Sequence, residues 1–178
     1  MAFDPAAACA PDVRARAAAV RLACFDVDGT LTDGRIVLDA DGRESKFFHV
    51  RDGQGLALLR RAGVAVAFVT ARPGGVAAHR AAELGVECHG EVKDKLAFVR
   101  ELAGRHGCAL EAVAFMGDDL ADLPALRACG FAAAPADAHA WILQHAHWRS
   151  TLRGGHGAAR EFCDLVLAAQ GRLEAYHA

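Results

Sequence analysis

Short apolar runs alternate with segments of helical periodicity along most of the chain. Continuous apolar runs at residues 64–69, 112–116 and 131–134 are typical of strands that are buried on both faces of a sheet. Segments 54–62 and 74–84 show helical spacing, and each is followed by a glycine. Because strands that alternate with helices need crossover connections, this pattern predicts an α/β fold with a doubly wound, mostly parallel sheet.

The remaining segments fit the same alternation. A first strand is predicted at 21–25, and strands at 35–39 and 46–50 flank a turn-forming segment and predict a small β-hairpin. A glycine-rich turn at 154–157 precedes a long amphipathic segment. Further helices are predicted at 11–19, 93–106, 122–128, 138–145 and 158–173, and one more strand at 86–89.

Length and composition restrict the class of protein. The 178 residues show no repeat or linker, which predicts one domain over 1–178, with a lead at 1–20 and a glycine turn, helix and tail at 154–178. A net charge of −2 argues against a nucleic-acid partner, and no apolar run is long enough to span a membrane. The six cysteines lack zinc-site spacing and the N-terminus lacks a signal-peptide pattern, so we expect reduced thiols and a cytoplasmic protein.

Polar side chains gather at the predicted carboxyl ends of the strands. In open α/β sheets ligands bind at that edge. Each group alone has an ordinary explanation, because Asp-x-Asp-Gly forms turns, aspartates cap helices, and a lysine on a helix is usually solvated. Their coincidence at one sheet edge favours a shared site. The residues placed there are Asp26, Asp28, Thr70, Lys95, Asp118 and Asp119.

These residue types suit phosphoryl transfer. A carboxylate such as Asp26 can attack phosphorus and form an aspartyl phosphate, and a second carboxylate, Asp28, can protonate the leaving oxygen and then activate water. Two carboxylates repel an anionic phosphoryl group, so a hard divalent cation is needed, and Mg²⁺ prefers oxygen ligands such as Asp26, Asp118 and a backbone carbonyl. Thr70 and Lys95 would orient the phosphoryl oxygens. The sequence contains no glycine-rich nucleotide-binding loop.

Several motifs carry a family resemblance. DVDGT at 26–30, Thr70, Lys95 and GDDLAD at 117–122 resemble the four motifs of the haloacid dehalogenase superfamily of phosphatases. Longer segments resemble the 3-deoxy-D-manno-octulosonate 8-phosphate phosphatase family within it, and the similarity covers about residues 20–173. These segments are DVDGTLTDG at 26–34, FHVRDGQG at 48–55, GDDLADLP at 117–124, ADAH at 136–139 and GGHGAAREFCD at 154–164.

The resemblance implies a Rossmann-like haloacid dehalogenase fold and Mg²⁺-dependent hydrolysis of a sugar acid phosphate in lipopolysaccharide precursor synthesis. Only 44 residues (70 − 26) separate Asp26 from Thr70, which leaves no room for a cap domain. The family pattern instead implies a homotetramer whose hairpins and tails cover neighbouring active sites. Thr30, His49 and Ala71 depart from the usual family residues, and the last two lie near expected substrate contacts.

The same resemblance assigns roles residue by residue. The implied catalytic residues are Asp26, Asp28, Thr70 and Lys95. The implied metal ligands are Asp26, Asp28 and Asp118, with Asp119 and Asp122 behind them. The implied substrate-binding residues are Asp28, His49, Arg51, Asp52, Gly53, Arg72, Arg80 and Lys95.

Other functions remain open at this stage. A related phosphatase of a nonulosonate 9-phosphate could use the same type of pocket. A receiver domain of a signalling protein also combines an acceptor aspartate, an acidic pair, a threonine and a lysine, but in a different order along the chain. A catalytically silent regulatory module is disfavoured by the intact Asp26 and Asp28. His145 and His147 lack further metal ligands nearby in sequence and fit ordinary structural histidines.

Overall fold

A parallel β-sheet forms the centre of the molecule in the computed structural model, which describes residues 4–173. All neighbouring strands of this sheet pair in parallel, and their order is β5-β4-β1-β6-β7-β8. This arrangement confirms the predicted α/β class. The strands are β1 (Leu22–Phe25), β4 (Ala65–Val69), β5 (Glu87–His89), β6 (Val113–Met116), β7 (Phe131–Ala134) and β8 (Trp148–Arg149).

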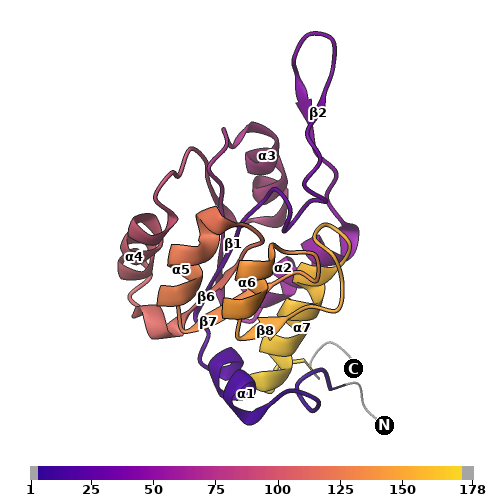
Figure 1. The fold of residues 1–178 in the computed structure, drawn as a ribbon. Helices are drawn as coiled ribbons and strands as arrows, with labels where there is room; N and C mark the ends of the chain where they lie inside the picture. The colour runs from indigo at the N-terminus through magenta and orange to yellow at the C-terminus, as the bar shows by residue number, and fades with distance from the viewer. Residues whose placement is uncertain (1–3, 174–178) are drawn as a thin grey trace.

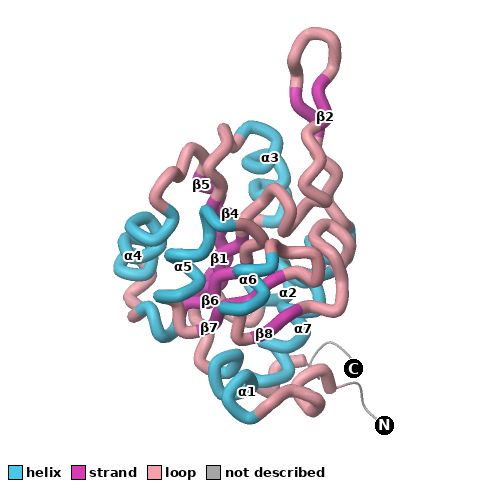
Figure 2. Tube along the Cα trace, viewed as in Figure 1, coloured by secondary structure: helices cyan, strands magenta, loops and turns pink. Residues whose placement is uncertain are grey.

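Helices cover both faces of the sheet, as Figures 1 and 2 show. The helices that pack on one face are α1 (Pro11–Ala18), α2 (Val50–Arg61), α3 (Gly75–Leu84) and α7 (Ala158–Ala169). Those on the other face are α4 (Lys95–Arg105), α5 (Leu123–Ala128) and α6 (Ala140–His145), with short 3₁₀ turns at Leu110–Ala112 and Leu120–Asp122. The fold is therefore doubly wound.

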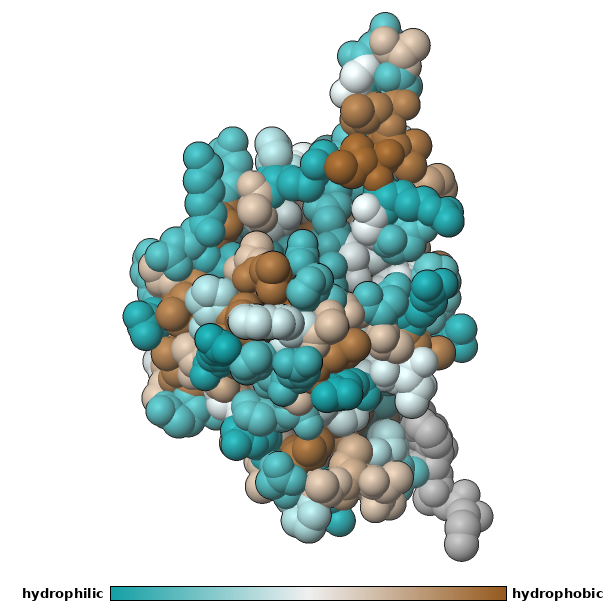
Figure 3. Space-filling view, viewed as in Figure 1, coloured by the Kyte–Doolittle hydropathy of each residue, from teal (hydrophilic) through white to brown (hydrophobic). Residues whose placement is uncertain are grey.

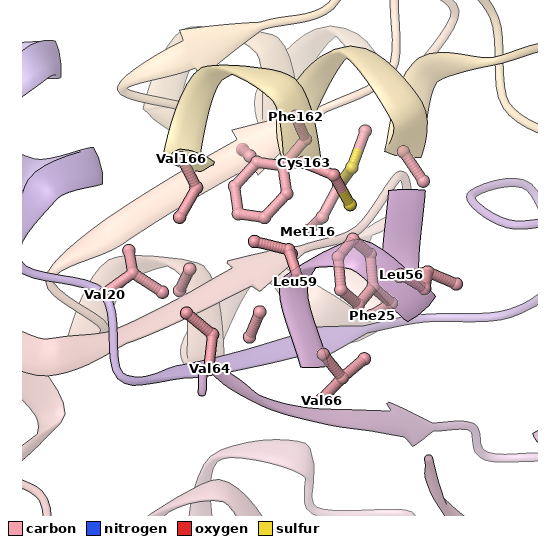
Figure 4. Close-up of a cluster of buried hydrophobic side chains, with 14 of the residues drawn as sticks. Val20, Phe25, Leu56, Leu59, Val64, Val66, Met116, Phe162, Cys163 and Val166 are labelled. Atoms are coloured by element: carbon pink, nitrogen blue, oxygen red, sulfur yellow. The ribbon is translucent and has the colours of Figure 1, made fainter. Parts of the chain in front are cut away.

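The central strand β1 contributes alternate side chains to the two cores. Phe25 joins the core beneath α2 and α7, whereas Cys24 joins the core beneath α4 and α5. The rings of Phe25 and of Phe162 from α7 meet edge to face, with 5.4 Å between ring centroids (Figure 4). Phe162 also stacks on Phe131, with 5.6 Å between ring centroids. Helix α7 is thus packed directly against the strand that leads into Asp26.

Helix α2 begins at Val50, so the predicted strand at 46–50 and the predicted helix start at Gln54 are both wrong. The apolar residues Phe47, Phe48 and Val50 suggested a strand, and the glycines at 53 and 55 disfavour a helix. Packing overrides that preference, because a Cβ at Gly55 would lie 3.1 Å from the Cβ of Cys163 on α7. The glycine therefore lets two helices approach closely.

The hairpin consists of β2 (Val37–Leu38) and β3 (Glu44–Ser45), which pair antiparallel and project from the body of the protein (Figure 1). Its base carries exposed apolar side chains, seen as a brown patch in Figure 3. Between β1 and β4 the chain forms only this hairpin and α2. The exposed apolar residues in and beside the hairpin are Ile36, Val37, Leu38, Phe47 and Val50.

None of the helices within residues 4–173 combines the length and the apolar character that a membrane span requires.

Candidate active site

The strand ends on one edge of the sheet surround a single cavity of about 310 Å³. Asp26 and Asp28 follow β1, Thr70 follows β4, and Asp118 follows β6. Lys95 is the first residue of α4. These five residues and Asp119, the six that the sequence placed at this edge, all line the cavity. The cavity is also lined by Gly29, Gly34, Ala71, Arg72, Ala121 and Asp122.

Lys95 is buried between two carboxylates. Its Nζ lies 2.8 Å from Oδ1 of Asp26 and 2.5 Å from Oδ1 of Asp122. Burial lowers the pKa of Lys95, but the two carboxylates outweigh that effect and raise its pKa above the ordinary value. The lysine therefore stays charged and fixes the orientation of Asp26.

Three carboxylates crowd the floor of the cavity. One oxygen each from Asp26, Asp118 and Asp122 lies within 4.8 Å of the others. Burial and then the neighbouring charge of Asp122 raise the pKa of Asp26 to about 7, although Lys95 opposes the shift. The pKa of Asp118 is also raised to about 7, by burial and by the charges of Asp26 and Asp122. A bound cation would relieve this repulsion, so the group fits a hard divalent ion.

The group differs from the set that the resemblance implied. Asp122 joins Asp26 and Asp118, whereas the side chain of Asp28 forms ion pairs elsewhere. Oδ2 of Asp122 accepts hydrogen bonds from the backbone N–H of Asp118 at 3.0 Å and of Asp119 at 3.2 Å. These hydrogen bonds hold the loop after β6 in place. Asp122 is fully buried, and its other oxygen faces Lys95. Asp119 is exposed and caps the 3₁₀ turn that follows it.

A glycine is required where the loop after β1 meets the loop after β6. Gly29 has φ +92°, and a Cβ at this position would lie 2.1 Å from Oδ2 of Asp118. The hydroxyl of the next residue, Thr30, donates a hydrogen bond to Oδ1 of Asp118 at 2.9 Å. The motif Asp-x-Asp-Gly-Thr therefore supplies two carboxylates and also clears space for a third.

Asp28 meets the base of the hairpin, a contact that the sequence analysis did not foresee. Its Oδ1 accepts a hydrogen bond from Lys46, and its Oδ2 lies 3.9 Å from Nε of Arg72. Glu44 in turn accepts from Arg72 at 2.6 Å and from Lys46 at 3.2 Å. A signal was present, because Lys46 is one of only three lysines in the chain. Its partner Asp28 lies 18 residues earlier in the chain, and the local sequence pattern does not predict that contact.

Several predicted substrate-binding residues do not line this cavity. Asp52 is buried and accepts hydrogen bonds from the backbone N–H of Gly157 and Arg160, so it caps α7. Arg51 is exposed and lines a separate cavity with Arg160 and Asp164. Only Asp28, Arg72 and Lys95 of the predicted substrate-binding set line the cavity of the carboxylates.

Arg80 and His49 do not line the cavity of the carboxylates and lie beside or just before α2. Nη2 of Arg80 would lie 2.1 Å from a Cβ at Gly53, so the guanidinium packs over that glycine. Its Nη1 also pairs with Glu83 at 2.7 Å. His49 precedes α2, and its Nδ1 is buried without a hydrogen-bond partner among residues 4–173.

The glycine turn at 154–157 packs against the loop of Asp28 in the same chain. A Cβ at Gly154 would lie 1.8 Å from the carbonyl oxygen of Gly29, and the N–H of Gly155 donates to the carbonyl oxygen of Thr30 at 3.1 Å. The resemblance led us to expect this turn and the tail at the site of an adjoining subunit; within one subunit the turn contacts its own loop after β1. The predicted role of the tail falls mostly on residues 174–178, outside the described residues.

Comparison with known proteins shows close relatives, although no family model matches the chain. The 3-deoxy-D-manno-octulosonate 8-phosphate phosphatase of Yersinia pestis is 43% identical over 166 residues, covering 93% of this chain and 89% of the relative. The protein of the same name from Escherichia coli K12 is 40% identical over 164 residues, covering 92% and 87%.

Solved structures agree with these relatives. A hypothetical protein from Xanthomonas campestris superposes with a TM-score of 0.97 at 52% identity, covering 99% of this chain and 97% of the other. The Moraxella catarrhalis 3-deoxy-D-manno-octulosonate 8-phosphate phosphatase, solved with magnesium, phosphate and the sugar acid, gives a TM-score of 0.91 at 35% identity, covering 93% and 96%. With these identities over nearly its whole length, the chain belongs to the 3-deoxy-D-manno-octulosonate 8-phosphate phosphatase family of the haloacid dehalogenase superfamily and is a phosphatase.

Proposed function

We propose that this protein is a Mg²⁺-dependent phosphomonoesterase that hydrolyses 3-deoxy-D-manno-octulosonate 8-phosphate to the free sugar acid and phosphate. The observation that carries the proposal is the buried Asp26 carboxylate, held by Lys95 at 2.8 Å on the floor of a polar cavity. The names of the relatives supply the substrate. In this role the product is a precursor for lipopolysaccharide.

Asp26 acts as the nucleophile and Asp28 as the acid and base. A carboxylate oxygen of Asp26 forms a bond to phosphorus, the bond from phosphorus to the sugar oxygen breaks, and the protonated Asp28 gives its proton to that oxygen. Asp28 then takes a proton from water, which attacks the phosphorus of the aspartyl phosphate and releases phosphate and the Asp26 carboxylate. Thr70 and Lys95 hold the phosphoryl oxygens during both steps.

Asp26 and Asp118, with Asp122 behind them, are the side chains that would hold the metal. Their close approach supports this assignment, as do the raised pKa values of Asp26 and Asp118, which burial and then the neighbouring carboxylates cause. When bound, Mg²⁺ offsets the repulsion between these carboxylates and the phosphoryl group.

The sugar acid needs cationic groups beyond the phosphate site. Arg72 lines the cavity, and Arg80 lies over Gly53 on the neighbouring helix. A guanidinium matches a carboxylate with two parallel hydrogen bonds, so these arginines are suited to the carboxylate of the substrate. Arg51, which lines a separate cavity in its own subunit, and His49 belong to the same proposal as residues of a site shared between subunits.

We further propose that the protein is a homotetramer of single capless domains in the cytoplasm. The apolar base of the hairpin supports the assembly, because Ile36, Leu38 and Phe47 are each more than half exposed in one subunit. Packing of hairpins in a tetramer would bury these side chains and cover the open cavity. All six cysteines are free, in keeping with a reducing compartment.

Phosphate release from a panel of sugar acid phosphates, with Mg²⁺ and with excess chelator, tests the function. The 3-deoxy-octulosonate 8-phosphate should be hydrolysed fastest, activity should vanish with chelator, and Asp26→Asn should show no turnover because an amide cannot form the acyl phosphate. Asp28→Asn should retain a residual rate, lower by about 10²–10⁴-fold. Faster hydrolysis of a nonulosonate 9-phosphate would show that this ester, and not the 8-phosphate, is the preferred substrate. A fully active Asp26→Asn enzyme would exclude nucleophilic attack by Asp26.

A further inference from the structure

The base of the hairpin places two charged residues against the active site, the buried side chain of Lys46 and the half-buried side chain of Glu44. Lys46 follows β3, and its side chain is only 3% exposed, although most of the hairpin is open to solvent. It donates to Asp28 and to Glu44, and Glu44 accepts from Arg72 at 2.6 Å. These four alternating charges link the hairpin to the loop after β1 and to the loop after β4.

Two atoms of this network are left for another partner. Oδ2 of Asp28 and Nε of Arg72 are buried, and neither has a hydrogen-bond partner within residues 4–173. They lie 3.9 Å apart, and both residues line the cavity. The two atoms form an ion pair with each other, but they are too far apart to share a hydrogen bond, so this buried donor and this buried acceptor each lack one. A group that both donates and accepts, such as a sugar hydroxyl, would satisfy both atoms if it entered between Asp28 and Arg72.

We infer that Lys46 and Glu44 are positioning residues for the leaving-group side of the active site. Lys46 donates a hydrogen bond to Oδ1 of Asp28, which leaves Oδ2 for the sugar oxygen that departs from phosphorus. Glu44 accepts a hydrogen bond from Nη2 of Arg72, which leaves Nε for the sugar portion of the ester. This inference rests on the proposed phosphatase function and adds the hairpin to the site that carries it out.

Burial separates this role from direct substrate binding. Lys46 already has two carboxylate partners and almost no exposed surface, so it acts through Asp28 rather than by touching the substrate. During cleavage the proton moves from Asp28 to the leaving sugar oxygen as the bond from phosphorus breaks. That transfer depends on where Oδ2 points, because a general acid must lie within hydrogen-bond reach of the atom it protonates.

Leaving-group dependence provides the test. A sugar alkoxide needs a proton when it leaves, whereas p-nitrophenolate is stable without one. Lys46→Met should lower kcat for 3-deoxy-octulosonate 8-phosphate by about tenfold or more, and kcat for p-nitrophenyl phosphate by less than about threefold. Glu44→Gln should mainly raise KM for the sugar phosphate, because Arg72 loses its anchor. Arg43→Met, which removes an exposed hairpin cation, is the matched control and should leave both substrates unchanged.

The outcomes separate this inference from the proposed function. An inactive wild-type enzyme on every sugar phosphate would contradict the proposed function, whereas an active wild type with equal losses on both substrates in Lys46→Met would overturn the positioning role. An unchanged Lys46→Met enzyme would overturn it as well. If Lys46→Met does not fold, Lys46→Gln keeps a hydrogen-bond donor without the charge, and the same ratio of the two kcat values decides the question.

Discussion

The ammonium group of Lys95 lies 2.5 Å from the carboxylate of Asp122, a side chain with no exposed surface. The other oxygen of Asp122 accepts the backbone N–H groups of Asp118 and Asp119. One buried ion pair thus joins the start of α4 to the loop after β6. Because Lys95 also contacts Asp26, removing the lysine would disturb the orientation of the nucleophile and the charge balance of the whole cluster.

Lys95→Met should therefore reduce both stability and activity. Breaking a buried ion pair leaves its partner uncompensated and costs about 3–5 kcal/mol of unfolding free energy. We expect this loss in urea unfolding at pH 8 without metal, and a smaller loss at pH 5, where Asp26, with a pKa of about 7, is largely protonated. Lys93→Met, two residues earlier and exposed, is the control and should unfold like the wild type. Equal stability of the two variants would contradict the role of Lys95.

The carboxylate cluster predicts a specific pH dependence. The pKa values of Asp26 and Asp118 are about 7 in the folded protein, above the value of about 3.9 for an aspartate in an unfolded chain. The folded state therefore binds protons more tightly, and these groups reduce stability as the pH rises from about 4 to about 7. Thermal unfolding of the metal-free protein should show this decline.

Magnesium should reverse that decline. The ion competes with protons for the same oxygens, so it should raise Tm more at pH 8 than at pH 5. In Asp118→Asn the metal-free decline should be shallower, and the effect of Mg²⁺ should be weaker. An increase in Tm that is equal at both pH values would show that Mg²⁺ binds elsewhere.

Much of the site was predictable because it follows from topology. The carboxyl ends of parallel strands lie on one edge of a sheet, so Asp26, Thr70 and Asp118 could be placed together from their positions after apolar runs. The contact of Lys46 with Asp28 depends on how the hairpin folds back, and no local periodicity encodes it. The motif that contains Asp52 indicated substrate binding, whereas only the packing of α2 on α7 reveals it as a helix cap.

The fold was predictable where elements are long and buried. The strand at Ala65–Val69 coincides with a run of apolar residues, and its neighbours on the sheet follow the same rule. Strand β8 was missed, because Trp148–Arg149 has only two residues and gains its pairing from β7 rather than from its own pattern. The start of α2 was missed because helix packing outweighs the low helix propensity of Gly53 and Gly55.

Charge placed on the hairpin should disrupt the proposed tetramer. Leu38 is 58% exposed in one subunit, and in the tetramer it would become buried against another copy. Leu38→Lys would bury an unpaired charge there, so light scattering after size-exclusion chromatography should show smaller species. Steady-state kinetics should show a raised KM for the sugar phosphate. Trp141→Lys, 53% exposed on α6, is the matched control and should keep the wild-type mass. A wild-type monomer with full activity would contradict the assembly.

The last prediction distinguishes a structural role for Asp52 from substrate binding. Its carboxylate accepts the N–H of Arg160 at 2.7 Å and the N–H of Gly157 at 3.2 Å, in the first turn of α7. No side chain of α7 itself caps this end, and a negative charge there also complements the helix dipole.

Asp52→Ala should therefore lower the unfolding free energy by about 1–2 kcal/mol, the usual cost of losing an N-cap. Asp52→Asn keeps one acceptor oxygen and should lose about half as much. In both variants KM for the sugar phosphate should stay near the wild-type value, because Asp52 does not line the cavity that contains Asp26. Arg51→Ala, at the adjacent exposed position, should leave stability unchanged. A raised KM with unaltered stability in Asp52→Asn would return Asp52 to the substrate-binding set that the resemblance implied.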